Sequence, residues 1–147
     1  MRIVRRPGFT LIELLLAISM MGILAGIGLP VYQSFQNRND VELATMIFVQ
    51  GVRRAQVLAR GVDGDANWGM YVTTGTVTLY SGASYAARTT TLDETYDISS
   101  GTMITGTNEF NFSKFTGLPA AGGTVVFTSP NNKTRTITIN AKGTVSY

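Results

Sequence analysis

The chain has 147 residues, with 12 lysines and arginines, 9 aspartates and glutamates, and neither histidine nor cysteine. This composition excludes Ser-His-Asp and Cys-His nucleophiles, ordinary zinc and copper sites, and disulfide bonds. We predict no enzyme activity, no metal and no cofactor. Charged residues make up 14% of the chain, against roughly 25% in average soluble domains, which indicates a segment that does not face water.

The N-terminal region combines a basic leader with an apolar stretch of membrane length. Residues 1–8 carry three arginines, and residues 9–32 carry a single charge, Glu13. A helix of about 20 apolar residues spans a bilayer. The positive-inside bias predicts a single-pass protein of the cytoplasmic membrane, with its N-terminus in the cytoplasm. Without residues 1–8 the net charge falls from +3 to zero, so the basic character belongs mostly to the leader.

Residues 9–60 are predicted to form one helix that changes character along its length. Residues 9–32 are apolar all round and form the transmembrane or assembly part. Residues 33–60 are amphipathic, with apolar side chains at steps of three and four residues: Val41, Ala44, Phe48, Val52, Ala55 and Ala59. We expect Gly61 to end the helix, because glycine accepts the left-handed conformation of a C-terminal cap.

Residues 61–147 are rich in threonine and glycine, which favours strands separated by turns. Six strands are predicted: Trp68–Thr73, Val77–Tyr80, Glu109–Ser113, Thr124–Ser129, Thr134–Asn140 and Thr144–Tyr147. Turn-forming residues between the last three predict a meander. Trp68 is expected in the core. The fold class is therefore α+β, with a long N-terminal helix packed on an antiparallel sheet of an extracytoplasmic domain.

The leader and the carboxylate of Glu13 are the most informative features. A secretory signal is cleaved after its apolar run, but the small residue Gly8 precedes the run here, so cleavage between Gly8 and Phe9 would retain the helix. A small-x-small pattern at residues 17–19 is the alternative cleavage site. A carboxylate in a membrane helix costs about 2.5–3.5 kcal/mol. In a helix bundle, Glu13 could pair with the new ammonium group at Phe9 of a neighbouring subunit. The alternative is a plain signal anchor in which the Glu13 side chain extends to the membrane surface.

Gly8-Phe9-Thr10-Leu11-Ile12-Glu13, with the basic leader before it, resembles the signal of type IV prepilins and type II secretion pseudopilins. The resemblance implies a prepilin leader at residues 1–8, cleavage between Gly8 and Phe9 by a prepilin peptidase, methylation of the Phe9 amine, and use of Glu13 in assembly. Pro30 also fits a family position. Its ring lacks an N–H and opposes the carbonyl of Gly26, so a helix break is expected there.

Three further stretches resemble the minor pilins and minor pseudopilins of the FimT, FimU and GspH group: residues 55–60, residues 68–72, and residues 134–139 followed by 143–145. The resemblance implies a structural subunit of a type IV pilus or a type II secretion pseudopilus. Its partners would be other pilins or pseudopilins through the N-terminal helix, the prepilin peptidase, the inner-membrane assembly platform, and membrane lipid before assembly. The final location would be a periplasmic or cell-surface filament.

Alternative functions depend on weaker patterns. Some FimT-like proteins bind DNA, which makes Lys133, Arg135 and Lys142 candidate DNA contacts in a pilus-displayed receptor for DNA uptake. A major pilin is a second alternative. Asp63-Gly64-Asp65-Ala66-Asn67 opens like a calcium-binding loop, but Trp68 and Thr74 replace the expected glycine and glutamate, so a polar turn is favoured.

Overall fold

The computed structural model describes residues 8–147, and it forms one long helix and eight strands over that range. The leader predicted at residues 1–8 lies outside this range except for Gly8. Helix α1 spans Leu11–Arg60 and is followed by a 3₁₀ turn, η1, at Asp63–Asp65. A second 3₁₀ turn, η2, lies at Thr90–Leu92. The chain divides into two units, the first ending at Phe35 and the second comprising Gln36–Tyr147.

The first unit contains the apolar half of α1. This half is long and apolar enough to cross a membrane, and none of its most apolar window is buried within the chain. Pro30 lies inside the bounds of α1, so the helix is not interrupted there in this structure. Proline nevertheless removes one backbone N–H donor from the ladder. A break at Pro30 in an assembled filament therefore stays a prediction.

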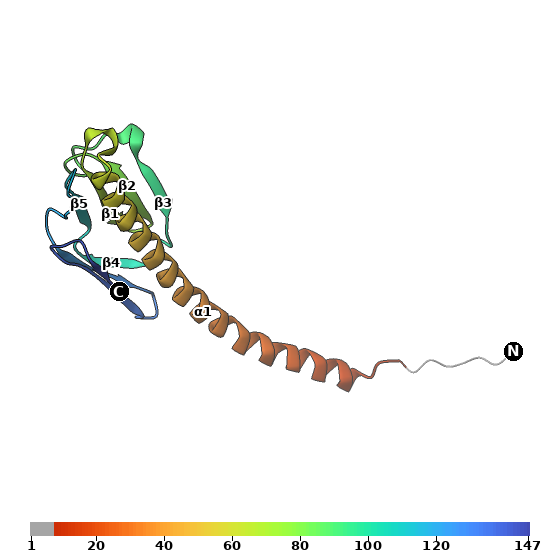
Figure 1. Ribbon diagram of the computed structural model, residues 1–147. Helices are drawn as coiled ribbons and strands as arrows, with labels where there is room; N and C mark the ends of the chain where they lie inside the picture. The colour runs from red at the N-terminus through yellow and green to blue at the C-terminus, as the bar shows by residue number, and fades with distance from the viewer. Residues whose placement is uncertain (1–7) are drawn as a thin grey trace. The chain divides into compact units, whose positions relative to one another are not determined.

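The strands of the second unit form two antiparallel sheets of four strands each (Figure 1). The first sheet has the order β3-β2-β1-β5, with β1 at Trp68–Thr73, β2 at Thr76–Ser81, β3 at Glu94–Asp97 and β5 at Glu109–Phe112. The second has the order β4-β6-β7-β8, with β4 at Met103–Gly106, β6 at Gly123–Thr128, β7 at Thr134–Ile139 and β8 at Val145–Ser146. The predicted α+β fold, a long helix packed on antiparallel strands, is confirmed, and the strands divide between two sheets. The predicted β6-β7-β8 meander is confirmed as well.

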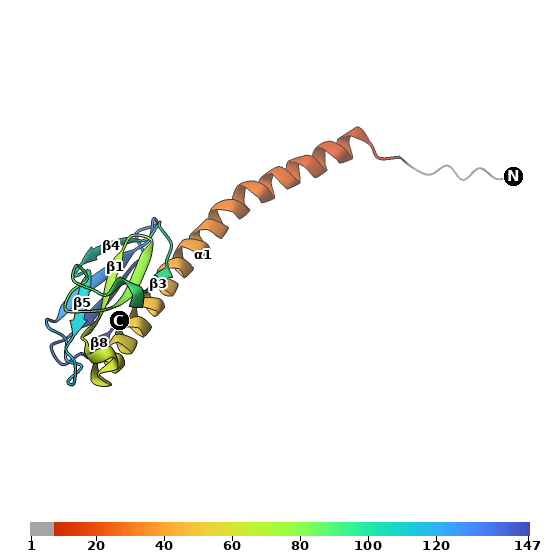
Figure 2. The same ribbon diagram turned by 90° about the horizontal axis from the view of Figure 1, so that it is seen from above.

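Residues 36–60 of α1 lie along one side of both sheets, as Figures 1 and 2 show from two directions. All six apolar positions predicted for the amphipathic half are buried, and Trp68 is also buried, as expected. Phe48 lies where the two sheets meet the helix. Its ring centroid is 5.8 Å from that of Phe110 in the first sheet and 5.7 Å from that of Phe127 in the second. One helical stripe therefore holds both sheets in one core.

Two strands, β3 and β4, were not predicted. Both are only four residues long, and each lies at the edge of its sheet. Asp97 and Gly106 end them, and these residue types are depleted in strands. Edge strands are commonly short and charged because such features prevent pairing with other chains. Sequence periodicity consequently carries little signal for them.

The C-terminal end of α1 differs from the prediction. The helix ends at Arg60 as expected, but Gly61 does not take the left-handed conformation, and the next residue does: Val62 has φ 56° and ψ 34°. The Gly61 N–H still donates to the Val57 carbonyl at 2.9 Å, so Gly61 continues the helical bonding. A β-branched residue with positive φ is rare and strained. The indole of Trp68 donates to the Asp63 carbonyl at 2.9 Å and anchors the turn that follows.

We expect Phe48→Ala to lower the free energy of unfolding of the second unit by about 3–5 kcal/mol, because the change opens a cavity at the junction of helix and sheets. Urea unfolding of the full chain in detergent, followed by fluorescence of its single tryptophan, measures the loss. The control is Leu43→Ala, at a side chain that is 57% exposed on the same helix. Equal effects of the two substitutions would contradict the described core.

Candidate functional site

The predicted cleavage site lies in an open stretch of chain. Gly8, Phe9 and Thr10 precede α1 and have no regular secondary structure, and all three are exposed. The Phe9 side chain is 84% exposed, and a Cβ added at Gly8 would meet no atom within 4 Å. A peptidase needs access to an extended backbone, and nothing in the described chain covers this peptide bond.

Thr10 caps the first turn of α1, a role that the sequence analysis missed. Its hydroxyl oxygen accepts a hydrogen bond from the Glu13 N–H at 3.3 Å. The residue before a helix commonly satisfies one of the free N–H groups of the first turn in this way. Thr10 and Glu13 have the spacing of a capping box, so the signal was present in the sequence. The cap separates Phe9 from the helix and leaves its amine outside the helical ladder.

The Glu13 side chain is exposed in the first turn of α1, and the positive end of the helix dipole favours a negative charge there. Within residues 8–147 the ion pairs are Arg54–Glu94, Arg88–Asp93, Lys114–Asp65 and Arg135–Glu42, and none of them includes Glu13. The carboxylate is therefore held at a fixed place on the helix without a cationic partner from the described chain. It can accept a cation from another molecule.

Comparison with protein families finds one match in this segment. Residues 4–29 match the family model described as the prokaryotic N-terminal methylation motif. This match supports a type IV pilin-like or pseudopilin-like protein. It covers both the predicted cleavage site and Glu13, whereas the rest of the chain lies outside the matched residues. No curated protein and no solved structure matched the chain.

The three candidate DNA contacts of the pilin-like chain do not form one surface. Lys133 and Arg135 lie at the start of β7 and help to line a hollow of about 250 Å³ together with Arg38, Val41, Glu42 and Thr134. Lys142 follows the far end of β7, in the turn before β8. Six strand residues at about 3.3 Å each separate the two ends by roughly 20 Å.

Arg135 is already paired within the chain. Its guanidinium donates to the Glu42 carboxylate, with Nε at 2.9 Å and a second, closer contact from the terminal nitrogen. The hydrogen bond and the charge of Glu42 raise the pKa of Arg135, which stays protonated. The contact between Glu42 and Arg135 was not predicted from the sequence, because the two residues are 93 positions apart in the chain.

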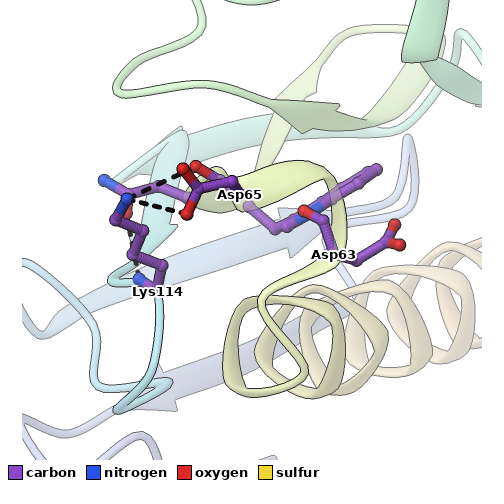
Figure 3. A network of polar contacts seen from close by, with 5 residues as sticks. Asp63, Asp65 and Lys114 are labelled. Atoms are coloured by element: carbon purple, nitrogen blue, oxygen red, sulfur yellow. Dashed lines mark hydrogen bonds and ion pairs between the residues drawn. The ribbon is translucent and has the colours of Figure 1, made fainter.

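The acidic loop after α1 forms the polar turn that the sequence favoured (Figure 3). Lys114 Nζ donates to Asp65 Oδ1 at 3.0 Å, whereas the Asp63 carboxylate points away from Asp65. The backbone N–H of Lys114 donates to the side chain of Asn67 at 2.9 Å. These contacts join the turn to the loop after β5. Over residues 8–147, no three acidic side chains gather into a metal-binding group.

A polar cluster behind the first sheet fixes the long loop between β2 and β3, and the sequence did not predict it. Glu109 accepts hydrogen bonds from the Tyr80 hydroxyl and from the Tyr85 backbone N–H, each at 2.8 Å. The Tyr85 ring stacks on Tyr71 with centroids 3.8 Å apart, and Arg88 lies over the Tyr85 ring at 3.8 Å. Burial, reinforced by Glu109, raises the pKa of Tyr80. We assign this cluster a structural role, because each member already has its partner.

Removal of the Thr10 cap should loosen the first turn of α1. We expect Thr10→Ala to cost about 1 kcal/mol locally and to speed exchange of the Glu13 amide hydrogen about fivefold, since the N–H loses its acceptor. Hydrogen exchange of the detergent-solubilised chain, resolved by NMR, measures this rate. Thr10→Ser keeps the hydroxyl and serves as the control. An unchanged rate in Thr10→Ala would show that the hydroxyl does not cap the helix.

Proposed function

We propose that this chain is a minor pilin or minor pseudopilin, a structural subunit assembled into a type IV pilus or a type II secretion pseudopilus. The observation that carries the proposal is a carboxylate in the first turn of an apolar, membrane-length stretch of helix, four residues after Phe9, where we predict the mature chain to begin. The methylation-motif match over residues 4–29 supports it.

Processing removes residues 1–8 and exposes a positive chain end at Phe9, which is then methylated and keeps its charge. Before processing, residues 9–32 hold the chain in the cytoplasmic membrane with the basic leader on the cytoplasmic side. Afterwards the same residues form the assembly helix, and residues 61–147 remain outside the membrane. The chain is thus the substrate of a prepilin peptidase and is moved into the filament by the inner-membrane assembly platform.

Assembly depends on the pairing of Glu13 with the Phe9 ammonium of a neighbouring subunit. The Thr10 cap supports an intermolecular pair, since it leaves Phe9 outside the helix while the carboxylate lies on it. An unpaired carboxylate among apolar helices costs about 2.5–3.5 kcal/mol. Subunits whose axial positions bring the two charges together avoid this cost, so the pair sets the stagger between neighbours.

Two alternatives are less well supported. A DNA receptor would use Lys133, Arg135 and Lys142, but Lys142 lies at the other end of β7 from the first two, and Arg135 is bonded to Glu42. Double-stranded DNA is usually bound by a continuous basic surface with many phosphate contacts. A major pilin would share the same helix and processing, and only its abundance in sheared filaments would distinguish it.

Mass spectrometry of the chain extracted from membranes tests processing directly. We expect the N-terminal peptide to begin at Phe9 and to carry one methyl group on its amine. Cells without a prepilin peptidase provide the control and should yield the chain with residues 1–8 attached. A mature chain that starts at Met1, or near Met20 after cleavage at residues 17–19, would contradict the proposed function.

A further inference from the structure

The hollow between α1 and the start of β7 carries more positive than negative charge. Three cationic side chains line it, from Arg38, Lys133 and Arg135, and Glu42 is its one acidic lining residue. The fold brings these four side chains together within the second unit. Arg38 and Glu42 lie one turn apart on α1, and Lys133, just before β7, and Arg135, in β7, lie opposite them. The hollow therefore holds an excess of two positive charges.

The β7 side of the hollow is held in place by backbone bonds. Ser129 and Lys133 close the turn between β6 and β7, with the Ser129 N–H donating to the Lys133 carbonyl at 2.8 Å and the Lys133 N–H donating to the Ser129 hydroxyl at 3.0 Å. Glu42 fixes the guanidinium of Arg135 through two hydrogen bonds. Arg38 and Lys133 are exposed, and no acidic group in residues 8–147 pairs with either.

The position of Arg38 in the chain indicates which anion the hollow meets. Arg38 follows Tyr32, the last residue of the predicted membrane part, by six residues of the same helix. Six helical residues at 1.5 Å each extend about 9 Å at most. The headgroup layer adds roughly 5–8 Å on each side of the hydrocarbon core, so the long Arg38 side chain can reach its outer part. Basic residues near this layer attract anionic headgroups.

We propose that this hollow binds the phosphate of an anionic lipid headgroup in the membrane that holds residues 9–32. Arg38 and Lys133 contact the phosphate oxygens, and Glu42 keeps Arg135 directed at the same space. At about 250 Å³ the hollow lies just below the range of small-molecule pockets, which suits a headgroup. The bound headgroup ties the second unit to the bilayer before assembly and is released when the subunit leaves the membrane.

A nucleic acid fits these observations less well. Duplex DNA presents phosphates along a convex surface, and affinity grows with the number of phosphates that are neutralised. Here two unpaired cations face a concave space, and Lys142 lies at the other end of β7. The proposal rests on the membrane insertion that the proposed function includes, but it does not depend on cleavage or filament assembly.

Native mass spectrometry of the full-length chain in a neutral detergent tests the proposal. Phosphatidylglycerol should be retained in preference to phosphatidylcholine. The double variant Arg38→Gln/Lys133→Gln should weaken binding of phosphatidylglycerol about 30-fold, since each basic residue near a membrane surface contributes about a fivefold factor. The single variant Lys133→Gln should weaken it about fivefold, and it provides the test if the double variant fails to fold.

The matched control is Arg53→Gln/Lys142→Gln, which removes one exposed arginine and one exposed lysine outside the hollow. We expect this control to bind phosphatidylglycerol within twofold of the original chain. Equal weakening by both double variants, or equal retention of both lipids, would overturn the proposal. Displacement of the lipid by equimolar inorganic phosphate would identify free phosphate as the ligand. Lys133-dependent binding of a short DNA duplex that is tighter than binding of phosphatidylglycerol would identify nucleic acid as the ligand. Either result overturns the lipid assignment.

All four proteins keep residues 1–13 and should be cleaved before Phe9 by a prepilin peptidase. Normal cleavage with no lipid preference would overturn the headgroup site alone. Absence of cleavage with a clear lipid preference would overturn the proposed function and leave the headgroup site standing.

Discussion

A single carboxylate in an uncharged helix is the constraint on which the rest of this molecule depends. Glu13 is the only charged residue between Phe9 and Asn37, and within residues 8–147 it has no cationic partner. The apolar side chains around it are exposed as well, and none of the most apolar window is buried within the described chain. Lipid can cover the apolar side chains, whereas a buried carboxylate is costly unless it is paired. In the proposed filament, the positive chain end of a neighbouring subunit supplies that pair.

The C-terminal half of the same helix also carries apolar side chains, and there the sheets of the second unit bury them. From Val41 onward, apolar side chains at steps of three and four residues form a stripe that is buried against the two sheets, whereas Leu43, Met46 and Val57 are exposed. Phe48 contacts one aromatic ring from each sheet, so the helix joins sheets that share no strand. A chain without cysteine cannot close this domain with a disulfide. Its stability depends on this packing and on the contacts that hold its long loops.

Periodic and strongly apolar segments were predictable, and pairings distant in sequence were not. The helix, its buried stripe and six of the eight strands followed from residue spacing and composition, because burial imposes a period on the sequence. Edge strands β3 and β4 carry no such period. The division into two sheets depends on which strands pair, and these pairings join residues that are distant in the sequence. The prediction of the helix end was off by one residue: Val62, not Gly61, takes the left-handed conformation.

The candidate sites divide in the same way. The cleavage site and Glu13 form one short motif, so sequence could indicate both. The Thr10 cap belonged to that motif and was overlooked, although its spacing to Glu13 is characteristic of a capping box. The basic hollow could not be predicted, because Arg38 and Glu42 approach Lys133 and Arg135 only after α1 packs on the second sheet. Lys142, near these cations in sequence, lies at the far end of the strand.

Replacement of Glu13 by glutamine is the most direct test of the account, since Glu13→Gln keeps the size of the side chain and removes only its charge. We expect the variant to be inserted and cleaved normally, while the fraction recovered in sheared filaments falls about tenfold or more, because a charged hydrogen bond contributes about 1.5–3 kcal/mol. Recovery equal to that of the unmodified chain would show that the carboxylate does not order the subunits, and the central claim would be wrong.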